Sequence, residues 1–404
     1  MRSGSTKRPT DGLVNVGNTC FLNAAFQALR FTRPLQEFLG VDTGLDAWRT
    51  SLHILEPRPP TALNSKDRAL IAAHTGTELV VQTAALVKSL CSQSKSHIWI
   101  DPRPFVRAFF EFAGSTSDEF RFGHMGDASE ALHAILDGLH THVCRPVSMT
   151  IRGVARTPAE RELVDSFHSW SAFFYKEYSP FINHYYGQTQ MRTMCRCGES
   201  KTVYEPWSTL KISIPGGDTA GAPVPSFRAC VNTAFMPEVV DDYRCDSCKQ
   251  VGQTVKYYSI SRFPDVLLLV FKRFTDRLAK IQARIEYDPD CVDLEEWGAW
   301  TPTTPTPTPT PTGIDAAGTQ NGLRRPPSIE GAASVAAHVG AGMYTVVSTI
   351  EQSGNMRGGH YSMRTRAETG VWRVYDDETV FPDSTRGAPT SDTYVLVLER
   401  LSDE

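Results

Sequence analysis

The sequence predicts an α+β fold in which a helical N-terminal lobe is followed by a mostly antiparallel β-sheet. Two observations lead to this prediction. Up to about residue 145, apolar side chains recur at the spacing of amphipathic helices. After about residue 185, short runs rich in Val, Ile, Leu, Tyr and Thr are bounded by Gly, Pro or Asp, as is typical of strands. A chain of 404 residues is long enough to bury a large core.

Four apolar stripes predict the helices of the first part. The first helix follows Asn18, and Pro34 stops it. Three further stripes cover residues 79–90, 105–110 and 128–139, and the last of them has Asp127 near its start. We expect these helices to pack together as one lobe.

Seven runs predict strands in the second part. They cover residues 204–214, 255–260, 266–271, 344–350, 360–365, 371–375 and 394–398. The run 266–271 is apolar throughout, which predicts a strand covered on both faces. Residues 301–312 nearly alternate Pro and Thr, and a Gly/Ala-rich stretch follows. This composition predicts a disordered insertion over residues 298–342.

Composition and charge exclude several classes of function. Lysine and arginine number 41 against 45 acidic residues, and a net charge of −4 argues against nucleic-acid binding. The sequence contains no apolar run of about 18 residues, so we expect no membrane insertion. Residues 1–11 are polar, and we expect them to be flexible and to lack a secretion signal. Nine cysteines, an odd number, then favour free thiols in the cytoplasm or nucleus.

The first motif with chemical potential surrounds Cys20. A cysteine nucleophile reacts as the thiolate, and Cys20 lies at the predicted first turn of a helix, with Asn18 or Thr19 as the cap. Unpaired N–H groups and the helix dipole there are expected to lower the thiol pKa. Asn15 can present its amide near the sulfur, where a tetrahedral oxyanion would form. A buried structural cysteine is the alternative interpretation.

A second motif places a histidine and a carboxylate near the end of the chain. A Gly-rich loop leads into a predicted strand that begins with His360. If the next strand forms a hairpin with it, Asp376 lies beside His360 and can accept its N–H. A structural histidine and a solvated acidic turn are the alternatives. The order Cys, His, Asp, with the cysteine on an early helix, is what a papain-like thiol hydrolase requires.

The two motifs resemble the cysteine and histidine boxes of the ubiquitin-specific protease family. Further segments are similar to the family's intervening helix, central strand and closing strand, at residues 127–139, 263–274 and 394–398. The resemblance runs from residue 12 to about 400 and implies one catalytic domain of the thumb–palm–fingers type. The implied parts are a thumb at about 12–145, fingers at about 185–260 and a palm at about 261–297 and 343–400.

The resemblance implies a deubiquitinating hydrolase that cuts after the C-terminal glycine of ubiquitin through an acyl-enzyme. It makes Cys20 the nucleophile, His360 the base and Asp376 the residue that orients the histidine. The other implied roles are an oxyanion donor for Asn15, assistance at the oxyanion for Asp377, contact with the basic ubiquitin tail for Asp127, and a channel for the terminal glycines at Gly358 and Gly359. The implied partners are ubiquitin and ubiquitinated proteins, bound by a monomeric domain.

A zinc site is expected in the fingers. Cys245 and Cys248 have the CxxC spacing that lets two thiolates share one zinc ion. Upstream, Cys195 and Cys197 form a CxC instead, with Met194 where the first cysteine would align. A degenerate finger with reduced thiols is the alternative. No cofactor is expected for catalysis.

Two other functions remain open from the sequence. One is a protease for another ubiquitin-like modifier, and the other is an inactive scaffold that binds ubiquitin without cutting it. Such scaffolds usually lose the nucleophile or the histidine, whereas Cys20, His360 and Asp376 are all present here. The sequence therefore favours an enzyme.

Overall fold

The computed structural model describes most of the chain. The described residues are 11–39, 68–91, 99–216, 224–275, 279–300, 342–355, 358–366 and 370–401. The N-terminus expected to be flexible and the expected 298–342 insertion lie outside these residues, apart from Asp11, residues 298–300 and Gly342. Within the described part, none of the helices is long and apolar enough to cross a membrane.

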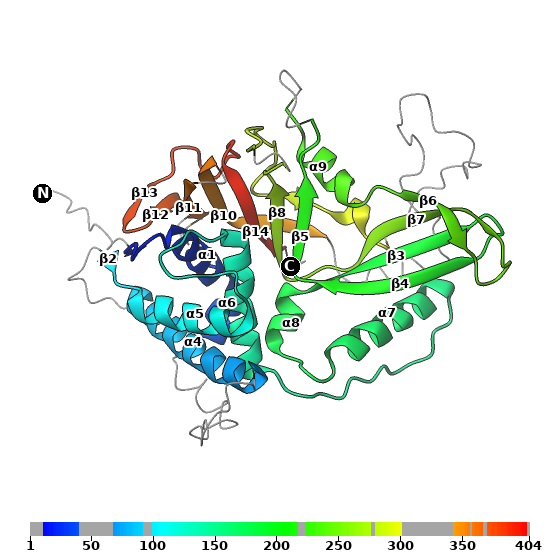
Figure 1. Ribbon diagram of the computed structural model, residues 1–404. Coiled ribbons are helices and arrows are strands. Elements are labelled where there is room, and N and C mark those ends of the chain that lie inside the picture. The colour runs from blue at the N-terminus through cyan, green and yellow to red at the C-terminus, as the bar shows by residue number, and fades with distance from the viewer. Residues whose placement is uncertain are drawn as a thin grey trace, which may run out of the picture.

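The N-terminal lobe is helical, as predicted. Its helices are α1 (Cys20–Arg30), α2 (Arg33–Phe38), α4 (Arg68–Cys91), α5 (Arg103–Thr116) and α6 (Ala128–Val143). Helix α1 is buried along its whole length, because it lies between the other helices and the main sheet (Figure 1). Pro34 does not itself end this helix. Helix α1 ends at Arg30, and Pro34 lies in the first turn of α2, where its missing N–H is not needed.

The main sheet has the strand order β13-β12-β11-β10-β14-β8-β5, with β9 paired to β10 (Figure 1). Its strands are β5 (Thr209–Ser213), β8 (Val266–Lys272), β9 (Val292–Asp293), β10 (Met343–Asn355), β11 (Gly358–Arg366), β12 (Trp372–Asp376), β13 (Thr379–Pro382) and β14 (Thr393–Arg400). Strand β5 runs parallel to β8, and the other described neighbours are antiparallel. The predicted α+β class is therefore confirmed.

Strand β8 is covered on both faces, as its continuous apolar run predicts. Val266, Leu268 and Val270 pack into the core shared with the helical lobe. Leu267 and Leu269 face a second core on the other side of the sheet. That second core is closed by helix α9 (Phe227–Ala234) and by the segment that contains the 3₁₀ helix η1 (Glu295–Trp297). The sheet therefore lies between two apolar layers.

A second, smaller sheet extends away from the main one (Figure 1). Its antiparallel order is β4-β3-β7-β6, formed by β3 (Gly187–Cys195), β4 (Ser200–Trp207), β6 (Glu238–Arg244) and β7 (Val251–Arg262). Helix α7 (Pro158–Phe174) runs below β4, and α8 (Pro180–Tyr185) leads from it into β3.

The prediction of one strand over residues 204–214 is wrong. The segment is divided between β4 of the small sheet and β5 of the main sheet. At the break, the hydroxyls of Ser208 and Thr209 both contact the ring of His133 on α6, at 3.3 and 2.5 Å. These contacts hold the chain against the helical lobe at the point where it passes from one sheet to the other.

The segment before α1 is attached to the far edge of the main sheet. It forms strand β1 (Gly12–Leu13), which pairs in parallel with β2 (Trp99–Ile100). The backbone N–H of Leu13 also donates to the carbonyl of Asp377, which lies in the β12–β13 turn, at 2.9 Å. The start of α1 is therefore held beside the end of β12.

Candidate active site

Cys20 is the first residue of α1, and its side chain is only 3% exposed. Thr19 occupies the N-cap position but makes no side-chain cap bond. Its hydroxyl instead accepts the backbone N–H of Val16, at 3.0 Å. Gly17 and Asn18 have positive φ angles of 106° and 57°, so the chain turns sharply before the helix. The uncapped helix end leaves backbone N–H groups available to an anion near the sulfur.

The expected direction of the Cys20 pKa is wrong. Burial raises the pKa of Cys20 above its ordinary value, and the nearby Asp377 carboxylate adds to this effect. Backbone hydrogen bonds from Tyr361, Phe21 and Cys20 itself act in the opposite direction, but burial outweighs them. The free protein therefore holds Cys20 as a neutral thiol, because removal of its proton would leave a charge out of contact with water.

His360 and Asp376 meet as the hairpin predicts. Strands β11 and β12 are antiparallel, and Nε2 of His360 lies 2.5 Å from Oδ1 of Asp376. The carboxylate therefore accepts the Nε2 proton and leaves Nδ1 as the nitrogen that can take up another. The backbone of Tyr361, the residue after His360, contacts the Cys20 thiol, so the start of α1 lies against β11. Within the described residues, no hydrogen bond joins Cys20 to His360.

Asn15 is held in one orientation. Its Oδ1 accepts the backbone N–H groups of Thr19 and Gly17, at 3.0 and 3.2 Å. Its Nδ2 must therefore face the other way, where it donates to Oδ2 of Asp377 at 2.9 Å. One hydrogen of this amide is engaged, and the second is the one available to an oxyanion near Cys20.

Asp377 lies next to the pair in a strained turn. Its φ is 48°, and its carboxylate accepts amide protons from Asn15 and from Asn23 of α1. Burial raises the pKa of Asp377, while these two hydrogen bonds and the nearby His360 act to lower it. The carboxylate therefore connects the β12–β13 turn to Asn15, which precedes Cys20, and to Asn23, which follows it.

Asp127 is committed to contacts within the chain. It is the N-cap of α6, and its Oδ1 accepts the backbone N–H groups of Ser129 and Glu130, at 2.8 and 3.2 Å. Its Oδ2 accepts the hydroxyls of Tyr394 and Tyr361, at 2.8 and 3.3 Å. The residue expected to contact ubiquitin therefore also joins α6 to strands β11 and β14.

The two glycines before His360 differ. A side chain at Gly359 would place its first carbon 2.3 Å from the carbonyl oxygen of Ser353 in the neighbouring strand β10. At Gly358 it would meet no atom of the described residues within 4 Å. Close packing within this chain therefore requires glycine at 359, whereas only Gly358 borders open space.

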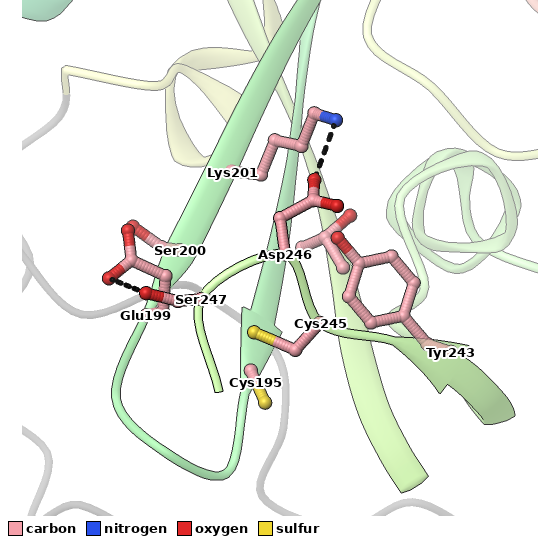
Figure 2. A pocket seen from close by; sticks show the side chains of 9 residues that line it. Cys195, Glu199, Ser200, Lys201, Tyr243, Cys245, Asp246 and Ser247 are labelled. Carbon is pink, nitrogen blue, oxygen red and sulfur yellow. Dashed lines mark hydrogen bonds and ion pairs between the residues drawn. The ribbon is translucent and has the colours of Figure 1, made fainter. Parts of the chain in front are cut away.

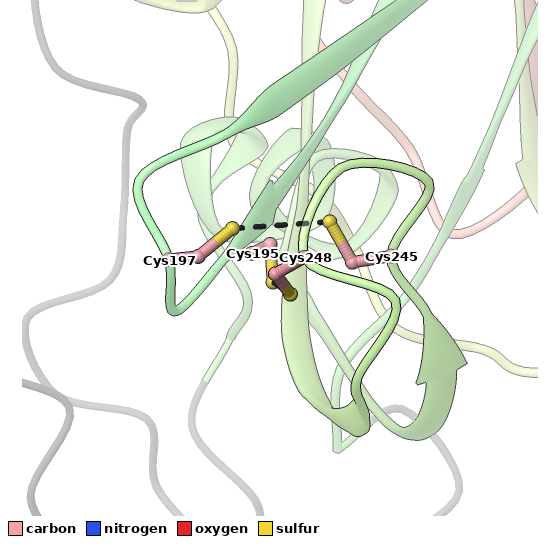
Figure 3. Close-up of side chains that lie close together, drawn as sticks. All are labelled: Cys195, Cys197, Cys245 and Cys248. Carbon is pink, nitrogen blue, oxygen red and sulfur yellow. Dashed lines mark hydrogen bonds between the residues drawn. The ribbon is translucent and has the colours of Figure 1, made fainter.

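The four predicted zinc ligands converge at the far end of the small sheet (Figure 3). Cys195 ends β3, and Cys197, Cys245 and Cys248 lie in the two turns beside it. All four sulfurs lie within 4.8 Å of one another, with Cys195–Cys248 at 3.9 Å and Cys197–Cys245 at 3.8 Å. A tetrahedral zinc–thiolate site with bonds of about 2.3 Å separates its sulfurs by about 3.8 Å, so the cluster fits this ion.

The thiols of the cluster differ in how readily they ionise, and the pKa values of Cys195 and Cys248 are raised. The backbone N–H groups of Cys248 and Ser247 lower the pKa of Cys245 to about 7. A polar hollow of about 330 Å³ opens beside the cluster, with the ion pair of Lys201 and Asp246 at its edge (Figure 2). The cluster is separate from Cys20, because the small sheet joins the main sheet at its opposite end, where β7 leads into β8.

A sequence model of the family described as ubiquitin carboxyl-terminal hydrolase matches residues 11–397. This chain belongs to that family. The match confirms the resemblance to ubiquitin-specific proteases that the cysteine and histidine motifs suggest.

Named members of the ubiquitin carboxyl-terminal hydrolase family align along nearly the whole chain. Ubiquitin carboxyl-terminal hydrolase 2 of Bos taurus is 26% identical over 406 residues, covering 97% of this chain and 55% of that protein. Ubiquitin carboxyl-terminal hydrolase 21 of Homo sapiens is 25% identical over 414 residues, covering 97% of this chain and 62% of that protein. The chain thus spans somewhat more than half the length of these curated relatives.

Solved structures share the fold. The structure titled "Structure of the SAGA Ubp8/Sgf11/Sus1/Sgf73 DUB module bound to ubiquitin aldehyde" has a chain that matches with a TM-score of 0.63 and 15% identity, covering 100% of this chain and 72% of that one. A second structure of the same module, bound to monoubiquitin, matches with a TM-score of 0.59 and 15% identity, covering 98% of this chain and 70% of that one. The predicted papain-like arrangement is therefore the fold of this family member.

Asn23 makes a contact at this site that the sequence motifs did not predict. This residue lies one turn after Cys20 in α1, is 3% exposed, and donates its amide to Asp377 at 2.8 Å. The sequence does contain an indication of this role, because Asn23 is a polar residue among the apolar side chains of α1. Its partner, however, is 354 positions away in the chain.

Proposed function

We propose that this chain is a cysteine-type deubiquitinase, which cleaves the bond after the C-terminal glycine of ubiquitin in isopeptide and peptide linkages. The observation that supports the proposal is the junction of α1, β11 and β12, where Cys20 contacts the backbone of Tyr361 and the neighbouring His360 contacts Asp376. Membership of the ubiquitin carboxyl-terminal hydrolase family and the shared fold of ubiquitin-bound structures support it.

In the proposed reaction, Nδ1 of His360 takes the thiol proton as the sulfur of Cys20 attacks the terminal glycine carbonyl. Asp376 holds the ring through Nε2 and stabilises the imidazolium that forms. The imidazolium then gives its proton to the departing lysine amine, which leaves an acyl-enzyme. Water, activated by the same histidine, hydrolyses the thioester and releases ubiquitin.

The oxyanion of each tetrahedral intermediate would receive hydrogen bonds from two sources. One is the second N–H of the Asn15 amide, and the other is the uncapped start of α1. We propose that Asp377 contributes by fixing Asn15, since its carboxylate accepts the first N–H of that amide. The bonds that hold Asn15 exist in the free protein, which supports its proposed role as a preorganised donor.

Substrate recognition is proposed at the entrance to this junction. Gly358 borders open space and would line the passage for the terminal glycines of ubiquitin. Asp127 would offer its negative charge to the basic tail, while its own oxygens remain bonded to Tyr361 and Tyr394.

We also propose that the four clustered cysteines bind one structural zinc ion. Cys195, Cys197, Cys245 and Cys248 would hold it with four thiolates, and the ion would tie the β3–β4 turn to the β6–β7 turn. The spacing of the sulfurs supports this assignment. No step of the proposed reaction involves the metal.

The test is cleavage of ubiquitin that carries a C-terminal fluorophore. We expect the unmodified chain to cleave it, and Cys20→Ala or His360→Ala to lower kcat by about 10⁴-fold or more. A ubiquitin with a C-terminal electrophile should form a covalent adduct with the unmodified chain but not with Cys20→Ala. The matched control is Cys291→Ala, which removes an exposed thiol and should leave cleavage and capture unchanged.

Three results would contradict the proposal. Near-normal turnover in Cys20→Ala would exclude the assigned nucleophile. Binding of ubiquitin without cleavage or capture would indicate the inactive scaffold instead. Faster cleavage of another ubiquitin-like protein carrying the same fluorophore would identify a different modifier as the substrate.

A further inference from the structure

We propose that Asn23 is a positioning residue for the reaction, which holds the Asp377 carboxylate in the place from which it orients the Asn15 amide. This inference rests on the proposed function. It concerns a residue that does not touch the substrate and acts through two others.

The amide nitrogen of Asn23 is surrounded by acceptors. Nδ2 donates to Oδ1 of Asp377 at 2.8 Å, and it lies 3.3 Å from the carbonyl oxygens of both Leu13 and Val14. These two carbonyls belong to the segment that precedes Cys20 in the chain. A single side chain of α1 therefore joins that segment to the β12–β13 turn.

Asp377 divides its two oxygens between two amides. Oδ1 takes Asn23 and Oδ2 takes Asn15, at 2.8 and 2.9 Å. If the bond to Asn23 is lost, the bond from Asn15 is the one side-chain hydrogen bond among the described residues that still holds this carboxylate. It can then rotate, and the amide that it orients can rotate with it. The proposed oxyanion donor would thus lose its fixed direction.

The oxygen of the Asn23 amide indicates which part of this side chain matters. Its Oδ1 is buried and has no hydrogen-bond partner among the residues that the structure describes. An unpaired buried carbonyl oxygen is unfavourable, and a leucine of similar volume at this position would avoid it. The amide is therefore explained by its donor nitrogen, and the acceptors of that nitrogen are Asp377 and the segment before Cys20.

Several charged or titratable groups surround Asp377. They are His360 on β11, Asp376 on β12 and Cys20 on α1. Burial raises the pKa of Asp377, and hydrogen bonds from Asn23 and Asn15 lower it. Removal of the Asn23 donor should therefore raise the pKa of Asp377 further. An active enzyme that needs ionised Asp377 would then lose activity at a higher pH as the solution is acidified.

The experiment compares Asn23→Leu with Gln27→Leu in the full chain. Gln27 is a matched control, because it lies one turn further along α1, is 2% exposed, and also donates its amide to the N-terminal segment, at the carbonyl of Asp11. It does not contact Asp377. Cleavage of the ubiquitin–fluorophore substrate is measured from about pH 5 to about pH 9, a range that spans the titration of histidine, and both variants are checked by thermal melting.

We expect Asn23→Leu to lower kcat about tenfold or more with little change in KM, since removal of an oxyanion donor itself lowers kcat by about 10²–10³-fold. Its acidic limb of kcat against pH should move to higher pH. Gln27→Leu should keep the kcat and the pH profile of the unmodified chain. Equal losses in the two variants would reduce Asn23 to a general role in stability and would overturn the inference.

The remaining outcomes are also decisive. If Asn23→Leu does not fold, Asn23→Ala removes the same donor without a clash and is judged by the same two measurements. If the unmodified chain is active and the Asn23 variant has the same kcat and pH profile, the inference about Asn23 is overturned while the proposed function stands. An unmodified chain that cleaves no ubiquitin substrate would overturn both the proposed function and the inference that rests on it.

Discussion

Cys20 illustrates how two local effects compete at one side chain. The start of α1 supplies N–H groups that favour a thiolate, and this is the effect that the sequence makes visible. The structure adds burial and the Asp377 carboxylate, and the sum raises the pKa of Cys20. The proposed nucleophile is therefore neutral in the free protein. It would be activated when His360 accepts its proton during attack rather than beforehand.

This balance predicts the pH dependence of Cys20 alkylation. In the absence of ubiquitin, the rate with iodoacetamide should rise with pH toward a midpoint above 9.0, the ordinary value for cysteine. The sign follows from the raised pKa, because the reactive thiolate appears only above it. Asp377→Asn should lower the midpoint, since the negative charge of Asp377 opposes ionisation.

The measurement is mass spectrometry of the peptide that contains Cys20. Cys20→Ser supplies the background from the other thiols. A midpoint below about pH 7, in the range of activated cysteines, would mean that a preformed thiolate exists, and would contradict the role given to burial.

Helix α6 meets the main sheet through its own cap. Asp127 satisfies the first N–H groups of the helix and accepts hydroxyls from Tyr361 and Tyr394 of two strands. The residue that the resemblance assigns to substrate binding is thus also a joint between the helical lobe and the sheet. Two roles at one carboxylate can be separated, because only one of them needs the charge.

Asp127→Asn should keep the helix cap, lower the melting temperature less than Asp127→Ala does, and raise KM for the ubiquitin substrate. Asparagine caps helices about as well as aspartate, whereas alanine loses the cap at about 1 kcal/mol. We therefore expect Asp127→Ala to lower both stability and substrate affinity. Thermal melting and Michaelis–Menten kinetics check the two effects. An unchanged KM in Asp127→Asn would leave Asp127 with a structural role only.

The two turns that end the small sheet are held by few apolar contacts. Cys245 is the one buried member of the cysteine cluster, and Cys197 is exposed. If zinc ties the turns together, purified protein should contain about one zinc ion per chain by elemental analysis. Cys197→Ser should lower this content and the melting temperature, while Cys144→Ser, a cysteine at the end of α6, should change neither.

A zinc content well below one per chain in the unmodified protein would contradict the metal site. The measured zinc content does not depend on enzymatic activity. It can also test whether Cys195 is the fourth ligand, at the knuckle where Met194 stands in place of a cysteine. Cys195→Ser should then lower the zinc content as much as Cys197→Ser does.

The molecule as a whole depends on a sheet that is packed on both sides. Strand β8 contributes alternate residues to the core under the helical lobe and to the core under α9. The proposed nucleophile, Cys20, comes from one side of this arrangement, and His360 comes from the sheet itself. The distance between them is therefore set by how the helical lobe packs on the sheet.

Leu268→Ala should destabilise the fold by about 2–5 kcal/mol, because it removes a buried side chain that cannot be replaced by water. Leu268 is 1% exposed and packs in the core shared with the lobe. Denaturant unfolding measures the change. Val371→Ala, at a side chain that is 50% exposed, should stay within about 0.5 kcal/mol of the unmodified chain. Similar losses in both variants would contradict this description of the core.

Prediction from sequence worked where a local pattern matches a local structure. The helices around Cys20 and Ala128 follow from their apolar spacing, and the β11–β12 hairpin follows from two short runs separated by a turn. That hairpin was enough to place Asp376 beside His360. The family resemblance combined these local motifs into a prediction of one domain over nearly the whole chain.

The elements missed were those with weak patterns. Strand β6 is mostly exposed and reads Glu-Val-Val-Asp-Asp-Tyr-Arg, with no regular alternation. Helix α7 buries only four of its 17 residues, although its capping box of Thr157 and Glu160 was a usable signal. Helix α7 packs against β4, which follows it at a distance of 35 positions where Ser169 donates to the carbonyl of Tyr204. Strand β6 pairs with the next strand, β7, and its exposed residues carry too little pattern to predict it.

The amino-acid sequence alone was sufficient for the motifs, the fold class and the family, because each depends on residues close together in the chain. Three-dimensional packing decided the net direction of the Cys20 pKa, the second role of Asp127, the approach of Cys195 to the other three sulfurs and the link from Asn23 to Asp377. These features join residues that are distant in the chain, 354 positions in the case of Asn23 and Asp377. Burial and hydrogen bonding between such residues exist only after the helical lobe has packed on the sheet.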